Sequence, residues 1–349
     1  MRWDIVPVDG EQWRRTLASL RHDVYHLPGY VALEAGRHAA DPAAVVAVDS
    51  GRRWAVPLLL RPVPGTDHVD ASSPYGYPGP LSNAALNDSL FFEDALLALR
   101  DALTSMGAIS CFLRLHPFLG PPLESFKRAG SPVVHGQTVV IDLTRSEEEL
   151  WRGLRANHRA QIRRARGLGV TVVEDEHWSR LAEFVSIYWA TMRRVGAEEP
   201  YFLPLSYFES LHRALDGSVH LLVVLRGDEV IAGGVYTDTG GIVQYHLGAT
   251  ASEHLQLNPA KVMFDHVTRW AKRRGNRWLH LGGGVGGAED SLFHFKAGFS
   301  PLRRPFATWR LIVDRGAYLR LAPGDASGEH SSYFPAYRAG EIVTAPPPR

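Results

Sequence analysis

The sequence holds a single cysteine, Cys111, among its 349 residues. One thiol excludes a disulfide framework and any metal cluster held by cysteines alone. No apolar run approaches the ~18–20 residues that a membrane-spanning helix needs, and the first residues, Met1-Arg-Trp-Asp, do not begin a secretory signal. We therefore expect a cytoplasmic protein that is not inserted in a membrane.

Lysine is scarce as well. There are 38 basic residues against 37 acidic ones, so the net charge favours no particular partner. Arginine supplies nearly all of the basic residues, and the lysines are only Lys127, Lys261, Lys272 and Lys296. This scarcity raises the question of why each remaining lysine is a lysine.

Several catalytic signatures are missing. The 16 histidines include no H-E-x-x-H motif and no Cys/His cluster, so we expect no metal site. No G-x-S-x-G elbow is present. Cys111 lies in the apolar run 109–115, which favours a core thiol over a nucleophile. With 45% hydrophobic and 21% charged residues, the composition is typical of a soluble globular protein with room for two modest domains.

The two halves of the chain show the same order of predicted elements. In the first half, three strands are followed by a helix, a strand, a helical turn and a strand, at 44–48, 54–61, 68–71, 88–103, 109–115, 123–127 and 133–143. In the second half the same series falls at 219–226, 229–237, 242–249, 258–274, 277–281, 291–297 and 308–313. The repeat predicts a duplicated α+β protein, each unit a mixed, mostly antiparallel sheet flanked by helices. We expect domains at 1–143 and 144–315, and a partly disordered tail at 316–349.

Capping sequences predict where four helices begin. The pairs Asp9 with Gln12, Ser146 with Glu149, and Ser206 with Glu209 have the spacing of capping boxes. Asn258 followed by Pro259 is typical of a cap and a first helical residue.

The helix that starts at Ser146 is rich in arginine. Five arginines step by three and four residues and would line one stripe of a single long helix: Arg152, Arg155, Arg159, Arg163 and Arg166. A polyanion would relieve the repulsion among them. A solvated basic face with partners elsewhere in the fold is the alternative.

Three other segments could belong to a site. Glycines at 282–287 between a strand and a helix could bind an anion or form a flexible turn beside a site. Lys296, in an aromatic-rich segment, could stabilise negative charge on an oxygen or cap the end of its helix. The loop 72–80, with Tyr75 and Tyr77, could form the wall of a ligand site or an ordinary ordered loop.

These features together resemble the FemABX-like, FemX-type aminoacyltransferase branch of the GNAT acyltransferase superfamily, over about residues 20–315. The resemblance rests on the arginine-rich segment 157–166, on Tyr188-x-x-Thr191-Met192-x-Arg194, and on Phe293-His-Phe295-Lys296-x-Gly298-Phe299. It implies two tandem GNAT-like units. It also implies transfer of an amino acid from aminoacyl-tRNA to an amine, either on a peptidoglycan-precursor peptide or on an antibiotic-type small molecule, without a covalent enzyme intermediate.

The resemblance also implies roles for residues. Lys296 matches the position that stabilises the oxyanion, and the five arginines would contact tRNA. The acceptor would be bound by Tyr75, Tyr77, Arg194, Tyr201, Tyr245 and Phe295. Peptidoglycan-directed relatives grip a diphosphate with a lysine in the first domain, but this chain has Glu34 and Arg37 there, which leaves a small-molecule amine open.

The choice of donor depends on the start of the helix at 258–274. GNAT enzymes that use coenzyme A carry Q/R-x-x-G-x-G/A there, whereas this chain reads Gln256-Leu-Asn-Pro-Ala-Lys261. Proline has no N–H and the glycines are missing, which counts against a pyrophosphate cradle. We therefore expect aminoacyl-tRNA as co-substrate and no further cofactor. The alternatives are an acetyl-CoA-dependent N-acyltransferase and a non-catalytic RNA-binding protein on a GNAT scaffold.

Overall fold

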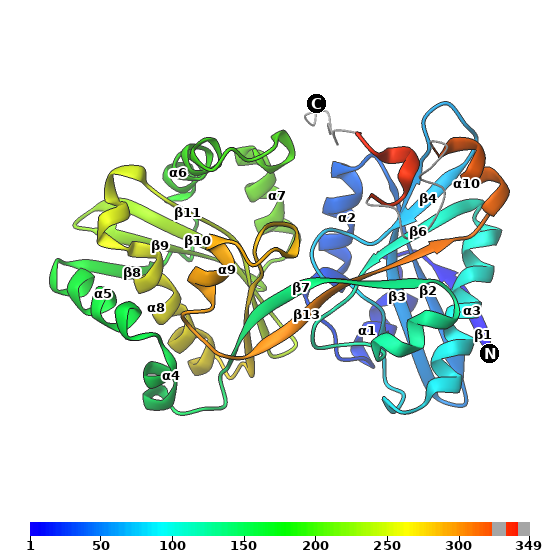
Figure 1. The fold of residues 1–349 in the computed structure, drawn as a ribbon, viewed down its shortest axis with the longest axis horizontal. Helices are drawn as coiled ribbons and strands as arrows, with labels where there is room; N and C mark the ends of the chain where they lie inside the picture. Colours follow the sequence, from blue (N-terminus) through cyan, green and yellow to red (C-terminus); the bar gives the residue numbers. More distant parts are fainter. Residues whose placement is uncertain (323–332, 341–349) are drawn as a thin grey trace. The chain divides into compact units, whose positions relative to one another are not determined.

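The chain forms two compact units in a computed structural model that describes residues 1–322 and 333–340 (Figure 1). Unit 1 comprises Met1–His135 with Phe306–Arg349, and unit 2 comprises Gly136–Pro305. In the described ranges, no helix combines the length and apolarity needed to cross a bilayer.

Unit 1 is built on a sheet with the strand order β1-β2-β3-β4-β6-β13, in which only β4 and β6 run parallel. The short strand β5 pairs with β3. Its elements are β1 Arg2–Val6, α1 Glu11–Ala18, η1 Val24–His26, α2 Pro28–Arg37, β2 Asp41–Asp49, β3 Arg52–Pro62, β4 Val69–Ser72, β5 Leu81–Ser82, α3 Ser89–Ser105, β6 Ala108–Arg114, η2 Leu123–Arg128, the end of β13 Arg303–Ile312, α10 Arg315–Leu321 and η6 Ala336–Arg338.

Alternation along β2 explains the two-sided core of unit 1. Val45 and Ala47 belong to a cluster with α3, whereas Ala44 and Val46 belong to a cluster with α1 and α2. Successive side chains of a strand point to opposite faces, so an apolar strand with no polar alternation needs a helix on each side. Cys111 lies in the α3 cluster and is buried, as the sequence predicts.

Unit 2 has the corresponding sheet order β8-β9-β10-β11-β12-β7, in which only β11 and β12 run parallel. Its elements are β7 Ser131–Asp142, α4 Glu147–Gly153, α5 Ala156–Gly167, β8 Val170–Glu174, α6 Leu181–Arg194, η3 Glu199–Tyr201, α7 Leu205–Ala214, β9 Val219–Arg226, β10 Glu229–Thr239, β11 Ile242–Thr250, η4 Ser252–Leu257, α8 Pro259–Arg273, β12 Trp278–Gly282, η5 Val285–Gly287 and α9 Ser291–Lys296.

Two consecutive glycines let helices approach both faces of this sheet. A Cβ on Gly233 would lie 2.7 Å from Phe184 of α6, and one on Gly234 would lie 3.2 Å from the sulfur of Met263 in α8. Adjacent strand residues face opposite sides, so α6 and α8 cover opposite faces (Figure 1).

The two units share one topology, which confirms the predicted duplicated α+β architecture of mostly antiparallel sheets. Each has an antiparallel series, one parallel pair and a final antiparallel strand. The final strands are exchanged: β7, from the end of the first half, pairs with β12 in unit 2, and β13, from the end of the second half, pairs with β6 in unit 1. The contact-based units therefore divide within β7 and β13 rather than at 143/144 and 315/316.

Part of the tail at 316–349 is ordered. Residues 315–321 form α10, and Phe334 and Ala336 pack on Tyr318 and Ile312. Arg338 forms an ion pair with Asp70. The expectation of disorder for 323–332 and 341–349 lies outside the described residues.

The predicted helix starts are partly correct. The capping box of Ser146 and Glu149 is present, with Ser146 N–H donating to Glu149 Oε2 over 2.8 Å. Helix α1 starts instead after Gly10 and α7 after Pro204, neither with a side-chain cap. Asn258 does precede α8, but its left-handed backbone (φ 54°) leaves its side chain outside the cap.

Candidate active site

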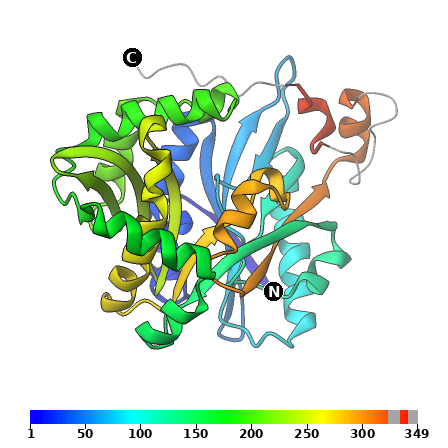
Figure 2. The same cartoon turned by 60° about the vertical axis from the view of Figure 1, so that its left-hand side comes forward.

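Lys296 ends the short helix α9, which follows β12 and a glycine-rich loop in unit 2 (Figure 2). Its side chain is buried, with 6% of the residue exposed. Its Nζ donates to the carbonyl oxygen of Gly283 over 2.6 Å and lies 5.5 Å from the ring centre of Tyr245. An ammonium has three N–H donors. One of them is used, and no carboxylate in the described ranges lies within ion-pair distance of Nζ.

Burial lowers the pKa of Lys296 to about 8, and the negative charge of Asp290 opposes this only in part. The charged form loses hydration when it is buried, which favours the neutral amine. At neutral pH the group is still mostly an ammonium, but one that water solvates poorly. Such a cation interacts more strongly with developing negative charge than a solvated one does.

The opening around Lys296 arises because β11 and β12 part. Their ladder ends at Gln244 opposite His280, although β11 continues to Thr250. A bulge in the β10–β11 pairing, between Val235 and Tyr236, bends the strands just beyond this point, opposite Tyr245 and Leu247. Lys296 touches Tyr245 on one strand and Gly283 just beyond the other, so its side chain spans the place where the ladder has stopped.

Asp290 fixes the glycine-rich loop that supplies this carbonyl. Its Oδ1 accepts from Phe293 N–H over 2.8 Å and so caps α9, and its Oδ2 accepts from Val285 N–H over 2.9 Å. A Cβ on Gly284 would lie 2.3 Å from that carboxylate, so the close approach requires glycine. The loop is a tight turn beside the site, held by its own residues.

Aromatic rings surround the other side of α9. Phe295 is half-buried, with ring centres 5.6 Å from Phe264 and 5.5 Å from Phe299. Tyr245 packs edge-on against Phe264 at 4.8 Å, and burial raises its pKa to about 12. Its hydroxyl lies against Gly248, where an added Cβ would come within 2.2 Å of the oxygen, so it is the ring of Tyr245 that faces Lys296.

The start of α5 caps the helix that carries Lys296. Arg155 donates its backbone N–H to Gly298 O over 2.9 Å and its Nη1 to His294 O over 3.1 Å. His158 places Nε2 3.1 Å from Phe295 O. The last carbonyls of a helix need donors, and here three are supplied from one segment. No sequence pattern predicts these contacts, because the partners lie 139 and 137 residues apart.

The prediction of one long arginine-striped helix is wrong. Leu154 and Arg155 have extended backbones (ψ 144° and 145°) and separate α4 from α5 (Figure 1). The stripe is therefore interrupted between Arg152 and Arg159.

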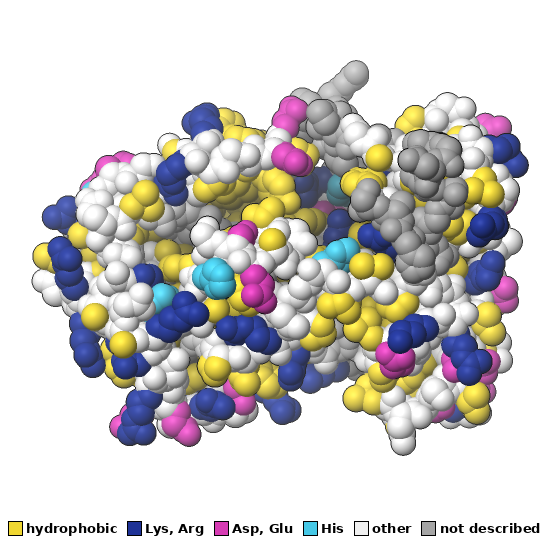
Figure 3. Space-filling view, in the orientation of Figure 1, with side chains coloured by type: hydrophobic (Ala, Val, Ile, Leu, Met, Phe, Trp, Pro, Cys, Tyr) yellow, Lys and Arg dark blue, Asp and Glu magenta, His cyan; other side chains and the backbone are white. Residues whose placement is uncertain are grey.

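Each of the five arginines also has a contact within unit 2, as the alternative of a solvated basic face with partners elsewhere in the fold expects. Arg152 pairs with Glu148, and Arg166 pairs with Asp265 over 2.5 Å. Arg159 donates to Arg152 O over 2.9 Å, and Arg163 lies 5.3 Å from the Trp151 ring. All except the half-buried Arg159 remain exposed, and Figure 3 shows basic side chains at the surface over α4 and α5.

The other residues expected to bind the acceptor are dispersed. Arg194 lies on α6 and donates to Thr250 O over 2.9 Å and to Ser252 Oγ over 2.7 Å, at the end of β11. Tyr201 is 41% exposed, and its carbonyl accepts from the Tyr188 hydroxyl over 2.7 Å. Phe295 and Tyr245 lie at Lys296, whereas Tyr75 and Tyr77 lie in unit 1.

The first turn of α8 carries a second buried lysine that sequence reasoning did not assign. Lys261 donates to the side-chain oxygen of Gln161 in α5, and its Nζ lies 6.0 Å from the Phe295 ring. Pro259, two residues before Lys261, is the first residue of the helix and offers no N–H.

One group of side chains has metal-ligand spacing. Ligand atoms of Glu229, Glu253 and His254 lie within 4.8 Å of one another. His254 Nε2 already contacts Glu229 Oε1 at 3.1 Å, and both glutamates are exposed, so an ordinary surface ion pair accounts for the group.

Comparisons with known proteins agree with this geometry. Residues 152–296 match the acetyltransferase (GNAT) domain family, and that range ends at Lys296. Among solved structures, FemX has a TM-score of 0.70 and 15% identity and covers 92% of this chain and 100% of its own. L-PGS from Bacillus licheniformis has a TM-score of 0.54 and 15% identity, covering 88% and 93%. No curated protein matches the sequence.

Residues 152–296 are therefore similar to a GNAT acetyltransferase domain, and the chain as a whole has the fold of FemX. The resemblance stated from the sequence is confirmed at the level of fold. A further similar structure is the C-terminal domain of a putative lysylphosphatidylglycerol synthetase from Agrobacterium fabrum, with a TM-score of 0.52 and 15% identity, covering 86% of this chain and 91% of that one.

Proposed function

We propose that the chain is an aminoacyltransferase that moves an amino acid from aminoacyl-tRNA to an amine acceptor in the cytoplasm. The observation that carries the proposal is the buried ammonium of Lys296, which lies where β11 and β12 part and has donors left over. A pre-positioned, desolvated cation stabilises the negative charge that develops on the carbonyl oxygen of an ester during attack.

The chemistry needs no covalent enzyme intermediate. The acceptor nitrogen attacks the ester carbonyl carbon, a C–N bond forms, and the carbonyl oxygen takes the negative charge. Lys296 donates to that oxygen. The C–O bond to the ribose then breaks, and the amine's proton passes to the leaving ribose oxygen directly or through water. An ester is already activated, so positioning and one or two donors are sufficient help.

The proposal of tRNA as donor rests on two features. The first is Pro259, which removes an N–H from the turn where a diphosphate cradle would be built. The second is the basic surface of α4 and α5, where Arg152, Arg155 and Arg163 are exposed. Their contacts within unit 2 leave further guanidinium N–H groups for phosphates. Arg159 and Arg166 complete the proposed tRNA-contacting set.

The proposed acceptor is an amine on a small molecule or on a peptidoglycan-precursor peptide. Residues 30–37 of unit 1 contain no lysine that could bind a diphosphate. Glu34 in α2 is buried and pairs with Arg37 over 3.0 Å. That favours the small molecule. Tyr75, Tyr77, Arg194, Tyr201, Tyr245 and Phe295 are the proposed acceptor contacts.

A second candidate is transfer of an acetyl group from acetyl-CoA. It is favoured by the match of residues 152–296 to an acetyltransferase domain family. The buried Lys261 in the first turn of α8 would then have to replace the missing glycine amides as the partner of the diphosphate.

Donor competition separates the candidates. Labelled aminoacyl-tRNAs and labelled acetyl-CoA are offered separately with a panel of amines, and the label in the amide product is counted. We expect transfer from tRNA alone. Transfer from coenzyme A alone would establish the second candidate, and tight tRNA binding without any transfer would indicate a non-catalytic RNA-binding protein.

The role of the arginines has its own test. Reversing Arg155 and Arg159 to Glu should weaken tRNA binding and reduce the slope of affinity against salt, because phosphate contacts release counterions. Since Arg155 also caps α9, an Arg152→Glu, Arg163→Glu variant serves as the partner experiment that leaves the cap intact. If affinity and salt slope were unchanged in both variants, this surface would not contact tRNA.

A further inference from the structure

Arg114 ends strand β6 in unit 1 and is half-buried between aromatic rings. Its guanidinium carbon lies 5.1 Å from the ring centre of Phe112 and 5.7 Å from that of Tyr75. Its only hydrogen bond from the side chain in the described structure is a long one, 3.5 Å from Nη1 to Ser73 O. An arginine carries five N–H donors, so most of this group's donors have no protein partner.

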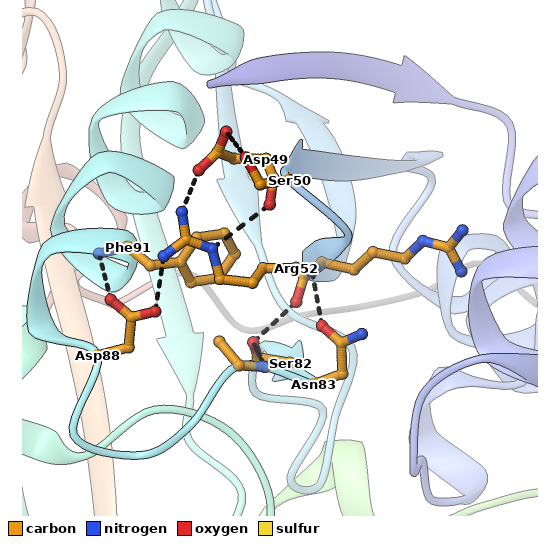
Figure 4. Close-up of polar contacts among 9 residues, drawn as sticks. Asp49, Ser50, Arg52, Ser82, Asn83, Asp88 and Phe91 are labelled. Carbon is orange, nitrogen blue, oxygen red and sulfur yellow. Dashed lines mark hydrogen bonds and ion pairs between the residues drawn. The ribbon is translucent and has the colours of Figure 1, made fainter.

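Arg52, in the same sheet, is an arginine whose guanidinium is hydrogen-bonded to carboxylates (Figure 4). It also lies over an aromatic ring, 4.9 Å from the centre of Phe91, but its edge is filled by carboxylates. Nη1 donates to Asp88 over 2.7 Å, and Nη2 donates to Asp49. Arg114 has the aromatic contacts of Arg52 without the two carboxylates.

The acidic groups nearest to Arg114 are already engaged. Glu34 attracts Arg114 electrostatically but forms its close ion pair with Arg37 at 3.0 Å. Arg61, which repels Arg114, has Asp70 as its own partner at 2.8 Å. Removing a charged group from water without a partner is costly, and desolvation lowers the pKa of Arg114 accordingly. A folded protein retains such a group where a ligand supplies the missing charge.

We infer that unit 1 binds an oxyanion, the carboxylate or phosphate group of a ligand, on the open edge of Arg114 beside Tyr75 and Phe112. The rings occupy the faces of the guanidinium, which leaves its edge for the two parallel N–H···O bonds that carboxylates and phosphates accept. Tyr75 is 42% exposed, so a ligand can reach this edge from solvent, and the Tyr75 carbonyl is held by the Tyr30 hydroxyl at 3.1 Å. The site shares Tyr75 with the proposed acceptor contacts, so the inference rests on the proposed function and adds the chemical class of one ligand group, and its test measures anion binding rather than transfer.

The test follows arginine side-chain signals by NMR in the full chain labelled with ¹⁵N-arginine. Sodium acetate and sodium phosphate are titrated separately against sodium chloride at constant ionic strength. We expect a saturable shift of the Arg114 Nε–H signal with at least one of them, and the stronger of the two identifies the carboxylate or phosphate source. The signal is assigned by its disappearance in Arg114→Lys.

A matched control is Arg53, a half-buried arginine of β3 that lacks both an ion pair and an aromatic partner in the described structure. Its signal should move only linearly with salt, and Arg53→Gln should leave the Arg114 titration unchanged. In Arg114→Gln, the anion-dependent rise in melting temperature should be lost, equivalent to at least about a ten-fold loss of affinity. If Arg114 shifts no more than Arg53 with either anion, or if Arg114→Gln keeps the anion effect, the inference is wrong.

Discussion

Unit 1 and unit 2 each place a Phe-Lys pair in a short helix after the second strand of the parallel pair. Phe126-Lys127 lies in η2 after β6, and Phe295-Lys296 lies in α9 after β12. The side chain of Lys127 is 61% exposed and pairs with Glu124 at 2.8 Å. Lys296 is 6% exposed and donates to a backbone carbonyl. One local sequence thus produces an ordinary surface ion pair in one unit and a desolvated cation in the other.

The difference lies in the strands that precede the two lysines. In unit 1, β4 stays paired with β6 to its last residue, Ser72, and the next residue still bonds to Phe112. In unit 2, Gln244 is the last residue of β11 that pairs with β12, opposite His280, and β11 continues for six more residues. Lys296 is buried at the place where β11 and β12 no longer pair, and there the carbonyl of Gly283 accepts its N–H. Topology alone therefore does not define the site.

The largest expected effect comes from removing the buried ammonium. Lys296→Ala should lower turnover by roughly a hundred-fold or more, on the scale of losing one oxyanion donor. Turnover and KM are measured with the donor identified by the competition experiment. Lys127→Ala is the matched control in the same sequence motif and should keep full activity. Equal rates for Lys296→Ala and the unchanged protein would mean that Lys296 has no role in the reaction.

The pH dependence sharpens the same contrast. Burial lowers the pKa of Lys296 to about 8, so under the proposed role of its ammonium, activity should be full below that pH and fall by about ten-fold per pH unit above it. Arginine stays charged in this range, so any activity retained by Lys296→Arg should not fall above pH 8. Turnover is measured from pH 6 to 10 with the acceptor amine saturating. A fall of the same shape in both proteins would assign it to another group.

A smaller effect is expected from the cap that holds α9. His158→Ala removes a donor to Phe295 O and should reduce turnover by up to about ten-fold, because a small displacement of the catalytic group is enough. The pKa seen in the rate profile should also rise toward that of an ordinary lysine as Lys296 becomes less buried.

His158→Gln, which keeps an N–H donor, should restore part of both quantities. Loss of stability with an unmoved pKa would mean that His158 supports the fold and not the position of Lys296.

The smallest effect should be seen at the exposed lysine. Lys127→Ala breaks only a surface ion pair at i,i+3, so the free energy of unfolding should change by less than about 0.5 kcal/mol. Urea unfolding followed by circular dichroism measures it. A much larger loss would show that the surroundings of Lys127 are closer to those of Lys296 than the contacts indicate.

Most of the fold could be predicted from the sequence, because strand and helix periodicities repeat in the same order in both halves. The break between α4 and α5 could not. Gly153 ends α4, but one glycine is tolerated inside many helices, and the bond from Arg155 N–H to Gly298 O joins segments far apart in the chain and leaves no sequence pattern. The starts of α1 and α7 were misplaced because Asp9 and Ser206 offer capping chemistry that the backbone does not use.

The candidate site was found from the sequence only in outline. The motif around Lys296 pointed to a resemblance, but the same Phe-Lys pair at Lys127 shows that the motif does not fix burial. The contacts of Arg155 and His158 with α9 join distant segments and leave no pattern in either. The roles of Lys296 and of the other candidate site residues stay predictions until the variants are measured.

The exchange of β7 and β13 has a consequence for synthesis on the ribosome. A growing chain acquires domains in order from its N-terminus. Here the edge of β6 stays uncovered until β13, which follows it only after most of unit 2, has been translated. Chaperones that shield bare sheet edges should therefore associate with the nascent first half, and a gene cut between the halves should yield two fragments that rescue each other only when produced together.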